Sequence, residues 1–117
     1  MGQKVHSYGF ASDGSGEVFV FHCPGCGYSH PFHVGGDRAK HPQWTFNGDL
    51  NQPTFNPSLV VNKGRQNQCH LFVRDGRIEF LSDCYHALKG KTVDMPDWEC
   101  DKETLRFEAL KRNHGSK

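Results

Sequence analysis

The chain has 117 residues, which is enough for one compact domain and too few for two. Hydrophobic residues make up 35% of the chain and nine Phe supply bulky core material, so the composition excludes wholesale disorder. No apolar run is long enough to cross a membrane or to form a secretion signal, and a formal net charge of +1 disfavours nucleic acid as a partner.

The distribution of glycine and proline predicts short strands joined by turns. Thirteen Gly and six Pro are scattered through the chain, which argues against long helices. Residues 1–16 are expected to form a flexible lead-in, and residues 17–117 a single domain. We expect residues 51–57 to be irregular because both prolines in them lack an amide donor. The β-branched and aromatic runs predict strands at 17–22, 29–34, 43–47, 58–62, 69–74 and 77–82.

The clearest predicted element is the hairpin around Asp75-Gly76. This dipeptide is typical of a two-residue turn with positive φ at both central residues, and such a turn fixes the register of the strands on either side. Val73 should lie opposite Ile78, and neighbouring side chains should point to opposite faces. Cys69 and His70 are therefore expected to face opposite sides of the sheet, so only one of them can enter a given metal site.

Five Cys and eight His in so short a chain indicate a metal site. An odd number of Cys without a secretion signal favours a reducing compartment, which we take to be the cytoplasm. Cys23-Pro24-Gly25-Cys26-Gly27 is the strongest motif, because two thiolates at this spacing can reach one tetrahedral Zn²⁺. The two glycines allow positive φ and close approach of the backbone. A redox dithiol is the competing interpretation, but it normally opens a helix in a β-α-β unit.

The remaining ligands of a single Zn²⁺ should come from the two open ends of the hairpin. Six donors are candidates for a site that needs only four: Cys23, Cys26, Cys69, His70, Cys84 and His86. Four protein ligands would close a structural site, whereas three ligands and a water would leave a reactive position. We therefore expect a mostly β fold, a small antiparallel β-sheet zinc-binding domain of the zinc knuckle type. A short C-terminal helix is expected over residues 97–112, with Asp97 as its cap.

An open zinc site would need a general base. Glu79 is the first candidate, because the predicted register places it diagonally across from His70 on the same face. The hydroxyl and amide groups of Thr54, Asn56 and Ser58 could wall a cleft or support the ligands, and His30 is a reserve ligand. Ser58 as a nucleophile would need a dedicated base, and no sequence feature identifies one.

Several motifs together resemble a known family. In order they are Phe21-His22-Cys23-Pro24-Gly25-Cys26-Gly27, Trp44-Thr45-Phe46-Asn47-Gly48, Pro53-Thr54-Phe55-Asn56-Pro57-Ser58, residues 69–78 and residues 83–93. The chain is similar to small phage and bacterial proteins of unknown function that are often mislabelled "ammonia monooxygenase". Relatives of that family are encoded beside bacterial ubiquitin-like conjugation genes. The resemblance implies a zinc-binding β-rich domain and peptidase activity on ubiquitin-like proteins.

Two functions follow as alternatives. The first is a zinc-dependent peptidase or hydrolase that acts on protein substrates of the ubiquitin-like kind, with a zinc-bound water as the nucleophile. The second is a structural zinc module without catalytic activity, which would bind a protein or peptide partner along an exposed strand edge.

Overall fold

The computed structural model describes residues 2–98 of the chain. They form eight strands and no helix: β1 (His6–Phe10), β2 (Glu17–Cys23), β3 (Tyr28–Val34), β4 (Thr45–Phe46), β5 (Phe55–Val61), β6 (Cys69–Arg74), β7 (Arg77–Phe80) and β8 (Thr92–Asp94). The fold is therefore all-strand, as the sequence predicts. Cys100 and nearly all of the helix expected over residues 97–112 lie outside the described residues.

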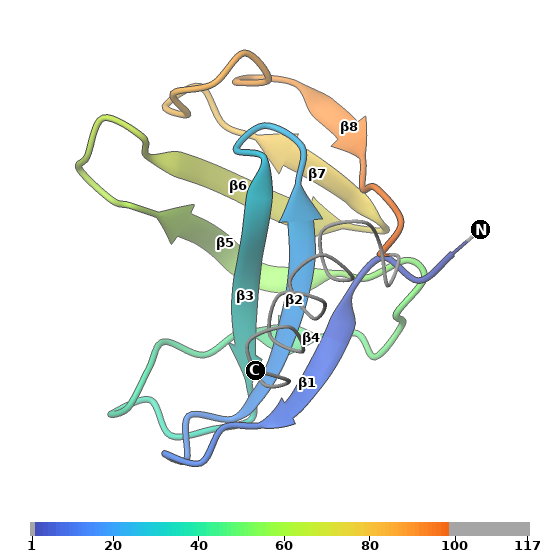
Figure 1. Ribbon diagram of the computed structural model, residues 1–117, viewed down its shortest axis with the longest axis vertical. Coiled ribbons are helices and arrows are strands. Elements are labelled where there is room, and N and C mark those ends of the chain that lie inside the picture. The colour runs from blue at the N-terminus through green and yellow to red at the C-terminus, as the bar shows by residue number, and fades with distance from the viewer. Residues whose placement is uncertain (1, 99–117) are drawn as a thin grey trace, which may run out of the picture.

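The strands form two antiparallel sheets. One has three strands in the order β1-β2-β3, and the other has five strands in the order β4-β5-β6-β7-β8. The strands of the first sheet cross those of the second at a steep angle (Figure 1). The loop between β2 and β3 lies beside the end of the larger sheet where β6 begins, and this proximity brings segments distant in sequence together.

The core between the sheets is built from stacked aromatic rings. Phe32 on β3 and Phe55 on β5 stack with their ring centroids 4.0 Å apart and their planes nearly parallel. Phe46 on β4 stacks on the same Phe55 at 4.6 Å, and Phe19 on β2 lies against Phe46 at 4.6 Å. Because Phe55 contributes to contacts with both sheets and is fully buried, it is the central residue of the core.

The hairpin predicted around Asp75-Gly76 is confirmed. Asp75 has φ 49° and Gly76 has φ 76°, so both central residues of the turn are in the left-handed region. Val73 pairs with Ile78, and Leu71 pairs with Phe80. The His70 carbonyl accepts a hydrogen bond from the Leu81 N–H at 2.9 Å, which extends the ladder to the start of β6.

The structure differs from the sequence interpretation at three places. Residues 6–10, expected within the flexible lead-in, form β1 and pair with β2. Strand β8 was not anticipated, because residues 92–94 are too few for a clear alternating pattern. Strand β5 begins at Phe55 and includes Pro57, which was expected in an irregular segment. The sheet tolerates this proline because the β5–β6 pairing is shifted between Phe55 and Leu59.

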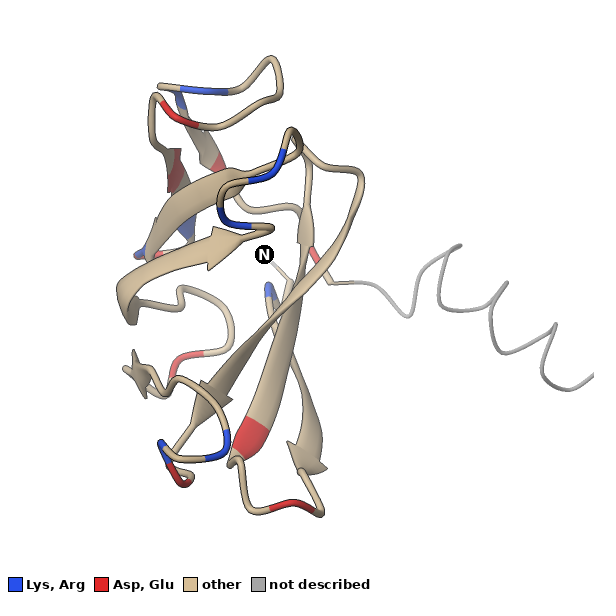
Figure 2. Cartoon of the chain, turned by 90° about the vertical axis from the view of Figure 1, so that its left-hand side faces the viewer, with Lys and Arg blue, Asp and Glu red and all other residues tan. Residues whose placement is uncertain are grey.

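Charged residues of both signs are interspersed over the described part of the chain (Figure 2). Three surface ion pairs join Lys4 to Asp97, Arg74 to Glu79 and Arg77 to Asp94. Such exposed pairs contribute little to stability, so the aromatic core has to carry most of it. Within residues 2–98 there is no helix with the length and apolar character needed to span a membrane.

The position of Phe55 at the centre of the core predicts a large loss of stability on truncation. Phe55→Ala should lower the free energy of unfolding by about 3–5 kcal/mol, because a fully buried ring is replaced by a cavity. Urea denaturation followed by circular dichroism measures this loss. Phe10→Ala is the control, since Phe10 is 77% exposed and its truncation should change little. Equal losses in the two variants would contradict this account of the core.

Candidate active site and metal site

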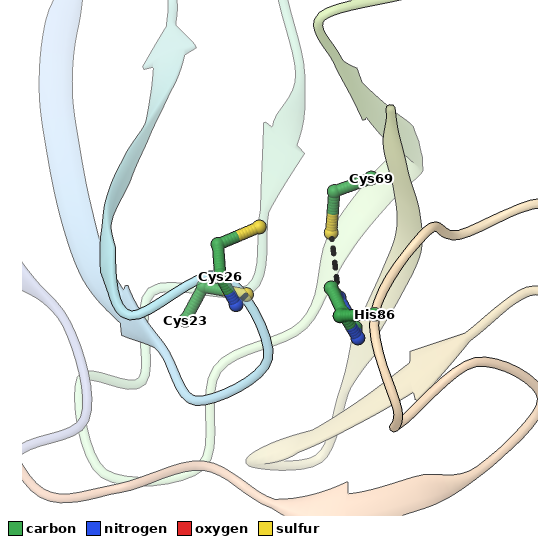
Figure 3. Close-up of side chains that lie close together, drawn as sticks. All are labelled: Cys23, Cys26, Cys69 and His86. Atoms are coloured by element: carbon green, nitrogen blue, oxygen red, sulfur yellow. Dashed lines mark hydrogen bonds between the residues drawn. The ribbon is translucent and has the colours of Figure 1, made fainter. Parts of the chain in front are cut away.

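A compact group of sulfur and nitrogen atoms lies between the two sheets. The ligand atoms of Cys23, Cys26, Cys69 and His86 all lie within 4.8 Å of one another, an arrangement that could hold a metal ion (Figure 3). Cys69 Sγ lies 3.3 Å from His86 Nε2. Cys23, Cys69 and His86 are buried and Cys26 is partly buried, so the group is largely shielded from water. We call these four residues the metal cluster.

Tight backbone geometry brings the two halves of the metal cluster together. Gly27 has φ 82° and its N–H donates to the Cys23 carbonyl at 2.9 Å, so the chain curls between the two cysteines. The Cys26 N–H points at Cys23 Sγ, 3.4 Å away. Gly25 needs no positive φ, contrary to expectation. A Cβ there would instead lie 2.2 Å from the His86 ring, so this glycine allows His86 to reach the cysteines.

The three thiols of the metal cluster differ in pKa because they are hydrogen-bonded and buried to different degrees. Hydrogen bonding from the Cys69 thiol lowers the pKa of Cys23 to about 4, and His30 contributes to the same effect. The pKa of Cys69 is raised, first by this hydrogen bond and then by burial. Burial also raises the pKa of Cys26. Negative charge is therefore favoured on Cys23 Sγ, where it would stabilise a bound cation.

Two of the six donor candidates lie outside the metal cluster. His70 follows Cys69 on β6 and faces the opposite side of the sheet, as expected from side-chain alternation. Cys84 fails to join because the chain turns after β7, where the Cys84 N–H donates to the Leu81 carbonyl at 3.2 Å. Its sulfur instead contacts the backbone N and O of His70, at 3.2 and 3.0 Å.

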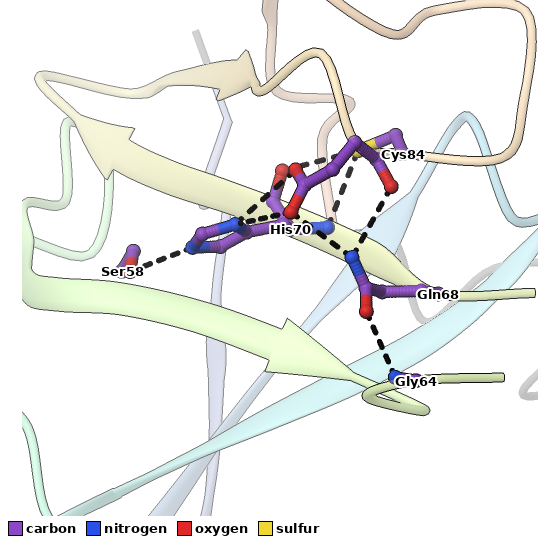
Figure 4. Close-up of polar contacts among 6 residues, drawn as sticks. Ser58, Gly64, Gln68, His70 and Cys84 are labelled. Atoms are coloured by element: carbon purple, nitrogen blue, oxygen red, sulfur yellow. Dashed lines mark hydrogen bonds and ion pairs between the residues drawn. The ribbon is translucent and has the colours of Figure 1, made fainter.

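His70 belongs to a second group on the other face of the larger sheet (Figure 4). Its Nε2 lies 3.0 Å from Ser58 Oγ. Its Nδ1 lies 3.1 Å from Oδ2 and 3.2 Å from Oδ1 of Asp83. Ser58, His70 and Asp83 therefore form a continuous hydrogen-bonded chain of hydroxyl, imidazole and carboxylate. We call this group the triad.

Strands β5 and β6 and the loop after β7 position the three residues of the triad. Val60 on β5 pairs with His70 on β6, so Ser58, two residues before Val60, is a diagonal neighbour of His70 on the same face. The indole Nε1–H of Trp44 donates to the Ser58 carbonyl at 3.2 Å and fixes this part of β5. Asp83 comes from the loop after β7, which returns beside the start of β6.

The direction of proton donation within the triad follows from its chemistry. A carboxylate only accepts hydrogen bonds, so His70 Nδ1 must carry the proton that faces Asp83. In a neutral imidazole Nε2 is then an acceptor, and the Ser58 hydroxyl donates to it. The arrangement can thus remove a proton from the serine hydroxyl while the carboxylate holds the imidazole in place.

The other candidate residues have mainly local partners. Glu79 pairs with Arg74, whose Nη1 lies 3.0 Å from its Oε1, and so it is already neutralised by a neighbour on β6. Thr54 accepts a hydrogen bond from the Asp75 N–H at 2.9 Å, which supports the turn between β6 and β7. Asn56 is exposed beside Pro57, and His30 is buried next to Cys23.

Sequence reasoning missed the triad for a specific reason. It fixed the register of β6 against β7 through the Asp75-Gly76 turn, but the β5–β6 connection is too long to fix the register of β5. Without the pairing of Val60 with His70, nothing placed Ser58 beside an imidazole. The prolines in front of Ser58 further concealed that it belongs to a strand.

Comparisons with known proteins indicate the family of the chain. No significant match was found among curated proteins or among solved structures. Residues 3–81 match the family model described as "Bacterial ubiquitination-like system serine protease (BubE)". The matched range includes Ser58 and His70, and Asp83 lies two residues beyond its end. The match covers most of the chain, and the protein therefore belongs to the BubE family.

Proposed function

We propose that the protein is a serine peptidase in which Ser58 is the nucleophile, His70 the general base and Asp83 the residue that orients it. The observation that carries the proposal is the continuous contact from Ser58 Oγ through His70 to Asp83, with distances of 3.0 and 3.1 Å. The same constellation occurs on unrelated folds and in different chain orders, so geometry and role identify it better than sequence position.

The first half of the reaction follows from the hydrogen bonds. Ser58 Oγ attacks the carbonyl carbon of the scissile bond while His70 Nε2 takes the hydroxyl proton. The resulting imidazolium is stabilised by Asp83, which accepts from Nδ1. When the carbon–nitrogen bond breaks, Nε2 gives its proton to the leaving amine, and the acyl group stays on Ser58 as an ester.

The second half uses the same groups with water as the nucleophile. His70 Nε2 takes a proton from water, whose oxygen attacks the ester carbonyl. The ester bond breaks, the proton returns to Ser58 Oγ, and the new carboxyl product leaves. Asp83 keeps the same imidazole tautomer in both halves, so the base is ready again after each cycle.

The metal cluster has a different role in this proposal. Three thiolates and one imidazole suit tetrahedral Zn²⁺. Gly25 packs closely against the His86 ring, and this packing allows His86 to lie within ligand distance of the cysteines. Four protein donors complete the coordination, so no position is left for an activated water. The ion would fasten the loop between β2 and β3 to the start of β6. Ser58 thus takes the role of nucleophile that was expected for a zinc-bound water, and His70 takes the role of base that was expected for Glu79.

The substrate class comes from the family. The family description, a serine protease of a bacterial ubiquitination-like system, supports a protein substrate of the ubiquitin-like kind that is attached to another group. Cys23, Cys26, Cys69 and Cys84 are free thiols, which fits a bacterial cytoplasm because thiols stay reduced there. The protein would separate such a modifier from the group attached to it.

The nucleophile can be tested with a fluorophosphonate probe, which forms a phosphonate ester with an activated serine and releases fluoride. The wild-type protein should be labelled at Ser58. Ser58→Ala should abolish labelling and lower the cleavage of ubiquitin-like fusion proteins by roughly 10⁵-fold, because no other residue of the triad can replace the nucleophile. Mass spectrometry locates the label and gel electrophoresis follows cleavage.

Ser12→Ala is the matched control, since Ser12 is an exposed serine in the loop between β1 and β2. It should leave labelling and cleavage unchanged. If the folded wild-type protein were neither labelled at Ser58 nor able to cleave such fusions, the peptidase proposal would be wrong. A protein module without catalytic activity would then be the better interpretation.

The metal can be tested separately from the reaction. The purified protein should contain one Zn²⁺ per chain, and Cys69→Ser should lose it and lower the melting temperature by roughly 10 °C or more. His70→Ala should keep the Zn²⁺ but lose cleavage, because His70 faces away from the metal cluster. Elemental analysis and the absorption spectrum of the Co²⁺-substituted protein measure these outcomes.

This pair of variants distinguishes a structural ion from a catalytic one. Cys69 and His70 are adjacent on one strand and differ in the face that they occupy. If His70→Ala lost the metal together with activity, His70 would be a ligand, and the assignment of separate roles to the two faces would be wrong.

A further inference from the structure

We infer that Gln68 is a positioning residue that holds the Asp83 carboxylate against His70. The inference rests on the proposed function, since it assigns a role within the same triad. Asp83 is the part of the triad that most needs support, because it lies on a loop and its side chain is 51% exposed. An exposed carboxylate on a loop has several rotamers open to it unless other groups fix one of them.

Gln68 contacts both the side chain and the backbone of Asp83. Its Nε2 donates to Oδ2 of Asp83 at 3.0 Å and to the Asp83 carbonyl at 3.2 Å. Oδ2 is also the carboxylate oxygen nearest to His70 Nδ1, at 3.1 Å. The amide and the imidazole therefore converge on one oxygen, and the amide fixes the position from which that oxygen accepts the His70 proton (Figure 4).

The orientation of the Gln68 amide is determined by a second partner. Its Oε1 accepts a hydrogen bond from the Gly64 N–H at 2.8 Å. A backbone N–H can only donate, so the oxygen must face Gly64 and the NH₂ group must face Asp83. Both hydrogens of the NH₂ group are then used on Asp83, and the side chain has a single satisfied orientation.

The backbone around Gln68 is fixed to the loop that carries Asp83. The Gln68 carbonyl accepts from the Tyr85 N–H at 3.0 Å, and the Cys84 sulfur contacts the backbone of His70. Segment 83–85 is thus attached to segment 68–70 on both sides of the triad carboxylate. Gln68 is the only part of this attachment that touches the carboxylate itself among the described residues, apart from His70.

The predicted effect falls on the chemical step more than on binding. Gln68 is separated from Ser58 by His70 and Asp83, so substrate contacts need not change when it is replaced. A carboxylate free to rotate would hold the Nδ1–H of His70 for a smaller fraction of the time. The rate at saturation should therefore fall, while the apparent affinity should stay nearly constant.

Two substitutions separate the contact of Gln68 with Asp83 from its contact with Gly64 in the loop between β5 and β6. Gln68→Glu keeps an oxygen that can accept from the Gly64 N–H, but it replaces the donor that faces Asp83 with a second carboxylate oxygen. Gln68→Met keeps the length and removes both interactions. Gln66→Met is the matched control, because Gln66 is exposed in the same loop.

The experiment measures modification by the fluorophosphonate probe as a function of probe concentration in the full, zinc-loaded chain. Gln68→Glu and Gln68→Met should lower the rate constant at saturation roughly 10- to 100-fold, as expected for losing a hydrogen bond to a charged group. The apparent affinity for the probe should stay within about twofold. Gln66→Met should match the wild type. A proton NMR spectrum should show the low-field resonance of the Nδ1–H in the wild type, and both Gln68 variants should lose or shift it.

The outcomes distinguish the inference from the proposed function. Variants of Gln68 that react like the wild type and keep the low-field resonance would overturn the inference. So would loss of Zn²⁺ or of apparent affinity in Gln68→Glu, because these would show a merely structural role. A wild-type protein that is not labelled at Ser58 would overturn the proposed function instead. In that case the NMR resonance still decides whether Gln68 holds the Asp83–His70 contact.

Discussion

Alternation of side chains along β6 is the constraint on which both sites depend. Cys69 and His70 are consecutive, so a regular strand must send one into the space between the sheets and the other to the outer face. The buried side receives a soft, sulfur-rich donor group, and the outer side receives a hydroxyl, an imidazole and a carboxylate. A shift of β6 by one residue would exchange the two faces and remove both sites.

The same alternation links the stability of the two sites. Two short segments, 68–70 and 83–86, carry residues of both sites. Each segment contributes one donor to the metal cluster and one residue to the triad, and the first also contributes Gln68. A small β domain with a modest core gains from a metal cross-link, and here that link would lie one residue from His70, the proposed general base. The proposed Zn²⁺ would thus stabilise the backbone from which His70 and Asp83 extend, without taking part in the reaction.

Much of the fold could be predicted from local signals, because Asp75-Gly76 and the β-branched runs act over a few residues. The alternation argument correctly separated Cys69 from His70. Cys84 was one of six candidate ligands, and the sequence did not show that the turn after β7, where the Cys84 N–H donates to the Leu81 carbonyl, directs it away from the metal cluster. Ser58 could not be paired with His70 from the sequence, because the contact depends on β5–β6 pairing across a loop whose length does not define a register. Local patterns thus predict hairpins well, and contacts between strands joined by long loops poorly.

The hydrogen bond from Trp44 to the Ser58 carbonyl gives the protein a natural optical reporter. The indole donates to the backbone of Ser58, the proposed nucleophile, and its ring lies edge-on against Phe32 on β3, 5.4 Å between centroids. Its fluorescence therefore depends on the surroundings of the segment that carries Ser58. Trp98, the other tryptophan of the chain, stacks on His22 and belongs to a separate environment. Replacing Trp98 with Phe would leave Trp44 as the single tryptophan, beside Ser58 and suited to stopped-flow observation of individual steps.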